Sequence, residues 1–94
     1  MIQIASIETN NAERLMKALC NHFARKITAK YEGDKGTIEF GDGKCEITAT
    51  SSSLEFLAEA NTIGGLDHVK RAVAKLYSVF TSGEDIQIDW RAPS

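Results

Sequence analysis

The sequence predicts an α+β fold, a two-layer sandwich in which two helices cover one face of a mainly antiparallel sheet. Two segments place apolar residues at the spacing of a helix, one over 10–25 and one after residue 62. Between them, apolar and polar residues alternate, which is typical of strands with one buried face. A single domain over residues 1–94, in the order β-α-β-β-β-β-α-β, is therefore expected.

The first two elements are a strand over 2–8 and a helix over 10–25. Ile2, Ile4 and Ile7 indicate the strand. Asn10 is a suitable N-cap, and Glu13 follows three residues later, so the two residues predict a capping box. The predicted buried stripe of this helix contains Ala12, Leu15, Met16, Leu19 and Phe23.

Four alternating segments follow, separated by turns at 33–34, 41–43 and 51–53. Glycines at the first two turns accept the positive φ angles of tight hairpins. One face is predicted to carry Ile27, Ala29, Tyr31, Ile38, Phe40, Cys45, Ile47, Ala49, Leu54, Phe56 and Ala58. The other is predicted to carry Lys30, Glu32, Glu39, Glu46, Thr48, Glu55 and Glu59. We expect this second face to be flat, wet and mostly acidic.

A second helix and a last strand complete the predicted fold. Thr62 and Asp67 are alternative N-caps, and Gly83 is expected to end the helix. The apolar stripe contains Leu66, Val69, Val73, Leu76, Tyr77 and Phe80. A last strand is indicated by Ile86, Ile88 and Trp90. It either pairs with the first strand or lies at the opposite edge of the sheet. Leu19, Phe56 and Leu76 are expected in the core.

Composition excludes several functions. The chain has 11 Lys and Arg against 13 Asp and Glu, for a formal charge of −2. This balance does not fit a general nucleic-acid binder. No apolar run is long enough to span a membrane, and residues 1–8 do not resemble a signal peptide. We therefore expect a cytoplasmic protein with reduced cysteines, no membrane partner and no cofactor.

Cys20, His22 and Cys45 are the candidate reactive or metal-binding residues. Cys20 and His22 are two residues apart, so on a regular helix their side chains point in widely different directions and cannot share one ion. Cys45 shares its predicted face with Ile47, as a packed cysteine does. Packing is the favoured interpretation for both cysteines, no catalytic residue or metal ligand is assigned, and a redox pair stays an alternative.

Four further features have a structural and a functional interpretation. His68 is expected to be solvated, with a site shared with His22 as the alternative. Gly64-Gly65 predicts a flexible start to the second helix rather than an anion site. The glutamates on the exposed strand face are expected to aid solubility rather than form a catalytic pair, because nothing desolvates them. Trp90 is expected in the core rather than at an interface.

Several segments resemble one known family. They are Leu19-Cys20-Asn21-His22-Phe23 with Lys26, Gly36-Thr37-Ile38-Glu39-Phe40, Gly43-Lys44-Cys45-Glu46-Ile47-Thr48-Ala49, Leu54 and Asp89-Trp90. Nearly the whole chain thus resembles the bacterial family called domain of unknown function 2218. The resemblance implies a small protein without an established activity, a fold similar to the TATA-binding-protein-like fold, and a contextual link to siderophore-interacting flavoproteins.

Two departures from the family pattern concern its histidines. Arg25 stands where the pattern often has His, and Leu76-Tyr77-Ser78-Val79-Phe80 lacks the His and Arg often found at the end of the second helix. If those family histidines formed a metal site or a catalytic site, this chain has lost it.

Three functions are consistent with these observations. The first is a non-catalytic binding or accessory module that contacts a partner protein or a small ligand. The second is a metal- or siderophore-linked iron accessory protein, which only the family context suggests. The third is a thiol-dependent enzyme or redox protein that uses Cys20, Cys45 or His22. We do not expect the protein to be an enzyme. A homodimer that forms through a sheet edge or a sheet face stays an alternative.

Overall fold

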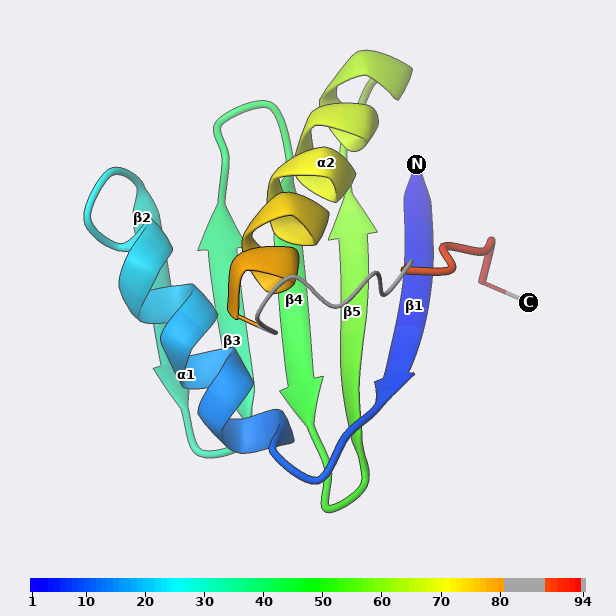
Figure 1. Ribbon diagram of the computed structural model, residues 1–94. Coiled ribbons are helices and arrows are strands. Elements are labelled where there is room, and N and C mark those ends of the chain that lie inside the picture. Colours follow the sequence, from blue (N-terminus) through cyan, green and yellow to red (C-terminus); the bar gives the residue numbers. More distant parts are fainter. Residues whose placement is uncertain (81–87, 94) are drawn as a thin grey trace.

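The computed structural model describes residues 1–80 and 88–93. Its elements are β1 (Ile2–Glu8), α1 (Ala12–Phe23), β2 (Thr28–Glu32), β3 (Lys35–Glu39), β4 (Lys44–Ala49), β5 (Ser53–Glu59) and α2 (Ile63–Phe80). Both helices lie on the same face of the sheet (Figure 1). The α+β class and the order of these elements are as predicted. Gly83 and Ile86 lie outside the described residues, and so does the side chain of Phe80.

The sheet has five strands in the order β1-β5-β4-β3-β2, and every pair is antiparallel. Strands β2 to β5 pair with their neighbours along the chain, and β1 lies beside β5. Residues 88–93 contribute one isolated antiparallel bridge, Ile4 to Arg91, with backbone N–H to C=O distances of 2.8 Å in both directions. The C-terminal segment therefore lies against the free edge of β1, as the first of the two predicted placements has it.

The core lies between the sheet and the helices. Leu19 is 0%, Phe56 2% and Leu76 8% exposed, so all three predicted core residues are buried. Trp90 is half-buried and packs against this core, with its ring centroid 6.1 Å from that of Phe56. Trp90 was expected in the core, and the structure places it at the edge of the core instead, half-buried. Tyr31 is the exception on the predicted apolar face, because it lies on the edge strand β2 and is 39% exposed.

The predicted capping box of α1 is wrong. The helix begins at Ala12 with Asn11 as the N-cap, and no side chain caps it. Its start lies two residues later than expected, so Asn10 stands outside the helix in a turn. Glu13 instead forms an i,i+4 ion pair with Lys17 at 2.9 Å. The helix also ends at Phe23, two residues before the predicted boundary.

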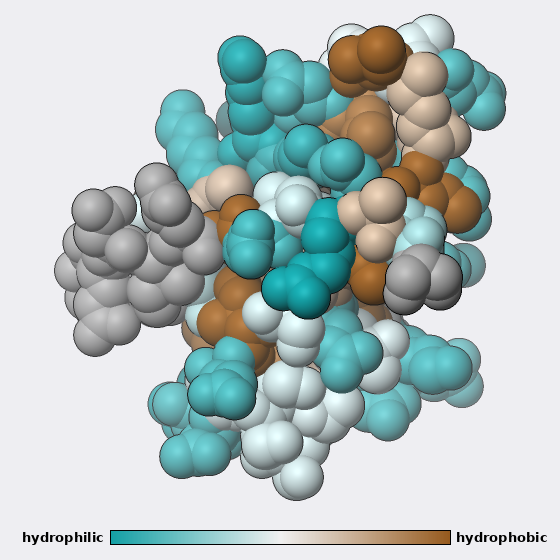
Figure 2. Space-filling model, turned by 90° about the vertical axis from the view of Figure 1, so that its right-hand side faces the viewer, coloured by the Kyte–Doolittle hydropathy of each residue, from teal (hydrophilic) through white to brown (hydrophobic). Residues whose placement is uncertain are grey.

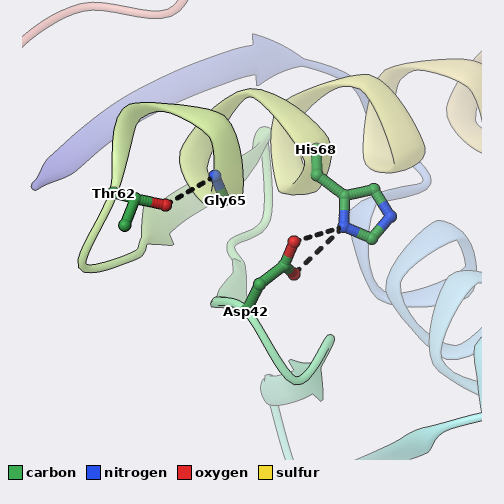
Figure 3. A network of polar contacts seen from close by, with 4 residues as sticks. All are labelled: Asp42, Thr62, Gly65 and His68. Carbon is green, nitrogen blue, oxygen red and sulfur yellow. Dashed lines mark hydrogen bonds and ion pairs between the residues drawn. The ribbon is translucent and has the colours of Figure 1, made fainter.

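The start of α2 is fixed by contacts with the turn between β3 and β4 (Figure 3). Of the two predicted N-caps, Thr62 is the one that caps the helix, since its Oγ1 accepts the Gly65 N–H at 2.9 Å. His68 Nδ1 lies 3.0 Å from both carboxylate oxygens of Asp42. A Cβ at Gly65 would collide with the Asp42 carbonyl oxygen. The expectation of a flexible glycine pair is corrected, because Gly64 and Gly65 lie inside the first turn of α2 and Gly65 allows close approach.

Candidate functional site

The face of the sheet opposite the helices, called the open face below, contains a hollow of about 470 Å³. Register determines which side chains share this face. Ala5 pairs with the core residue Phe56, so the alternate residues Ile4 and Leu57 lie on the open face. The expectation of a flat surface is therefore corrected, because the open face contains this hollow.

The floor of the hollow is apolar. Ile4 and Leu57 are half-buried although no helix covers them, and they are directly paired between β1 and β5. The sequence prediction missed both residues. The available signal was Leu57, which breaks the alternation of β5 by placing an apolar residue between Glu55 and Glu59.

The rim of the hollow carries both signs of charge. Glu46 and Glu55 were predicted on this face, and the register confirms it. Lys35 from β3 and Arg91 from the C-terminal segment are additional cations that the prediction did not place here. The open face is therefore not predominantly acidic at the hollow, where two cations stand opposite two anions.

These rim charges are not paired with one another within residues 1–80 and 88–93. Arg91 has a long contact of 3.5 Å to Asp89, and both side chains are mostly exposed. Glu55 Oε2 accepts a hydrogen bond from Ser53 Oγ at 3.3 Å. The open face thus presents its charged groups next to an apolar floor. Such a combination can orient a ligand by its polar ends while burying its apolar part.

The candidate thiols lie on the opposite side of the sheet, in the core. Cys20 is 1% and Cys45 is 0% exposed, and both are free. Burial raises the pKa of Cys20 to about 11. Burial raises the pKa of Cys45 to about 12, with a further contribution from nearby Cys20. Both thiols are therefore protonated at neutral pH, which disfavours the nucleophilic thiolate.

The two histidines lie at the ends of a row of aromatic rings. His22 is exposed, and its ring contacts Phe23 edge-on at 6.3 Å. Phe23 contacts Phe40 at 5.2 Å, and Phe40 contacts His68 at 5.7 Å. Two rings thus separate His22 from His68. In the described part of the chain, no three His, Cys, Asp or Glu residues gather where they could hold a metal ion.

A second hollow of about 640 Å³ lies where β1 and α2 begin. Met1, Ile2 and Ile63 line it and are 56%, 38% and 73% exposed. Figure 2 looks onto the β1 edge and shows apolar side chains at the upper end of the molecule and again at mid-height. This surface is more open than the hollow of the open face, and its charged lining side chains, Asp67 and Lys70, both lie on α2.

Fold and site together define a small α+β protein with an open-faced antiparallel sheet and a ligand-sized hollow on that face. The chain belongs to the family described as uncharacterized protein conserved in bacteria (DUF2218), whose model matches residues 4–91. The resemblance found in the sequence is thereby confirmed. No curated protein matches the chain.

One solved structure supports the same architecture. The NMR structure of PA4090 from Pseudomonas aeruginosa has a TM-score of 0.82 to this chain and 24% sequence identity. The match covers 96% of this chain and 94% of the Pseudomonas chain. The similarity therefore establishes the fold. Among the described helices, none has the length and apolar character needed to cross a membrane.

Proposed function

We propose that the protein is a non-catalytic binding module that holds a small ligand on its open face. The observation that carries this proposal is the hollow of about 470 Å³, with Ile4 and Leu57 as its floor and charged side chains at its rim. Small-ligand sites combine apolar surface with a few polar groups in a concave shape. Residues 1–94 would act together as one domain, because both the sheet and the C-terminal Arg91 contribute to the site.

The raised pKa values of the two buried thiols favour binding over thiol chemistry. The same free thiols support a cytoplasmic location, where cysteines stay reduced. The iron-linked alternative has no counterpart in the geometry of the described residues.

The test is an NMR screen of small amphipathic molecules against isotope-labelled protein. Ligands should shift the backbone amide signals of Ile4, Glu46 and Leu57 and should raise the melting temperature, because a ligand that binds only the folded state stabilises it. Replacing Leu57 by Lys places a charge on the floor and should abolish binding. Val79→Lys is the matched control, since Val79 is 65% exposed on α2, away from the open face.

Two outcomes would contradict the proposal. One is a screen in which ligands shift signals only outside the open face. The other is a Leu57→Lys variant that keeps its fold, as shown by its amide spectrum, and binds with unchanged affinity. A screen without any binder would also count against it.

A further inference from the structure

One row of side chains crosses the open face in an ordered sequence of charge. Arg91 forms its bridge with Ile4, Ile4 pairs with Leu57, and Leu57 pairs with Glu46. Paired residues in antiparallel strands direct their side chains to the same face. From Arg91 to Glu46 the row therefore runs from a cation over two neighbouring apolar residues to an anion. Beyond Glu46 it continues through Thr37 to Lys30 on the edge strand β2.

The length of this row sets the size of what it can bind. Neighbouring strands are about 4.8 Å apart, so the Cα atoms of Arg91 and Glu46 are separated by three spacings, about 14 Å. Both side chains are long enough to lean over the floor, which shortens the gap between their charged groups. A linear molecule of about eight methylene-sized units fits between them.

The adjacent row has a different character. It contains Ser6, Glu55, Thr48, Lys35 and Glu32 in spatial order. Glu55 lies on the β1 side of Lys35, the reverse of the order of charges between Arg91 and Glu46. A polar residue, Thr48, separates the two charges, and Glu55 already accepts the hydrogen bond from Ser53. Of these two rows of described residues, only the one from Arg91 to Glu46 joins opposite charges through apolar surface.

We propose that the ligand of the open face is an elongated zwitterion, with a carboxylate at one end, an ammonium group at the other and an alkyl chain between them. This inference rests on the proposed function. The Arg91 guanidinium receives the carboxylate, because its planar donors match two carboxylate oxygens. Glu46 receives the ammonium group, and the alkyl chain covers Ile4 and Leu57.

The test compares ω-aminooctanoate with octanoate and octylamine, which have the same chain length but one charge each. NMR titration should give an affinity for ω-aminooctanoate about ten-fold higher than for either comparison molecule. Arg91→Gln should weaken binding of ω-aminooctanoate and octanoate and leave octylamine unchanged. Glu46→Gln should weaken binding of ω-aminooctanoate and octylamine and leave octanoate unchanged.

Lys35→Gln and Glu55→Gln are the matched variants, since they remove charges of the same kinds from the adjacent row. Neither should change the preference for the zwitterion. If these variants remove that preference while Arg91→Gln and Glu46→Gln do not, the assignment of the two ends is overturned.

The outcomes separate this inference from the proposed function. Equal binding of all three molecules at the open face would overturn the zwitterion and leave the binding module standing. The same holds if the broader screen finds open-face ligands of another class while ω-aminooctanoate does not bind. If neither the three molecules nor the broader screen shifts the open-face signals, both proposals fail.

Discussion

Cys20 lies directly over Gly36, so close that a Cβ atom at residue 36 would stand 2.7 Å from the Cys20 Sγ. This contact joins α1 to β3 and explains why a residue without a side chain occupies a buried strand position. The thiol fills the space that a side chain on β3 would otherwise take. Cys20 is thus part of the helix-to-sheet packing.

Gly36→Ala should destabilise the protein by about 1–3 kcal/mol, because the added methyl group overpacks the contact with Cys20. In a Cys20→Ala background the same change should cost at least about 0.5 kcal/mol less, since the colliding sulfur is absent. Urea unfolding of the four proteins in this double-mutant cycle measures the coupling. Equal costs in both backgrounds would show that Cys20 is not what excludes a side chain at residue 36.

The buried thiols predict a loss of stability at alkaline pH. Burial raises the pKa of Cys20 from 9.0 to about 11, and that of Cys45 from 9.0 to about 12. The folded state therefore binds these protons more tightly than the unfolded state. Their contribution to stability is complete below pH 9.0 and declines as the pH rises from there through about 11 and 12.

A Cys20→Ala/Cys45→Ala variant tests this pH dependence, because it retains the lysines and tyrosines that titrate in the same range. Between about pH 8 and about pH 10.5, its free energy of unfolding should fall less than that of the natural sequence. Reagents that modify thiols should also react slowly with the native protein and rapidly after denaturation. Fast reaction of either thiol in the native state would contradict the burial described for both.

Thr62→Ala should lower the free energy of unfolding by about 0.5–2 kcal/mol, because it removes the hydrogen bond from the Gly65 N–H at the start of α2. Thr62→Ser keeps the hydroxyl group and should retain most of the stability. Thermal unfolding followed by circular dichroism measures both variants. If serine and alanine had the same effect, the cap would contribute nothing through its hydroxyl group.

Leu76→Ala should destabilise the protein by about 2–5 kcal/mol, because the side chain is 8% exposed and its loss leaves a cavity under α2. Val79→Ala on the same helix should change the stability by no more than about 0.5 kcal/mol, since Val79 is 65% exposed. Chemical denaturation distinguishes the two. A larger effect at Val79 would mean that the helix presents a different face to the sheet.

Periodicity predicted the strands and the core well, because burial of one face repeats along each element. It placed β1 within the observed bounds and found Met16, Leu19 and Val69 on buried helix faces. It failed at the start of α1, where several neighbouring polar residues could each serve as the cap. Local sequence does not decide between Asn10 and Asn11, since tertiary packing sets where the first turn begins.

The candidate site was harder to predict, since it is assembled by pairing between distant segments. Leu57 was visible as a break in the alternation, but its partner Ile4 looked like an ordinary strand residue. Arg91 reaches the site only through its bridge to Ile4, which no local pattern indicates. The sequence prediction instead selected Cys20, His22 and Cys45, whose residue types suggest chemistry but whose positions serve packing or lie outside the hollow.

The placement of β1 beside β5 has a consequence for the order in which the sheet assembles. Strands β2 to β5 join through short turns, so their pairing closes only small loops. Pairing of β1 with β5 must bring together the two ends of a segment that contains α1 and three strands, which carries the largest loop-closure entropy in the sheet. The hairpins can therefore form before β1 is added. The floor of the hollow is completed at this step, because Ile4 lies on β1, the strand that joins the sheet after the hairpins.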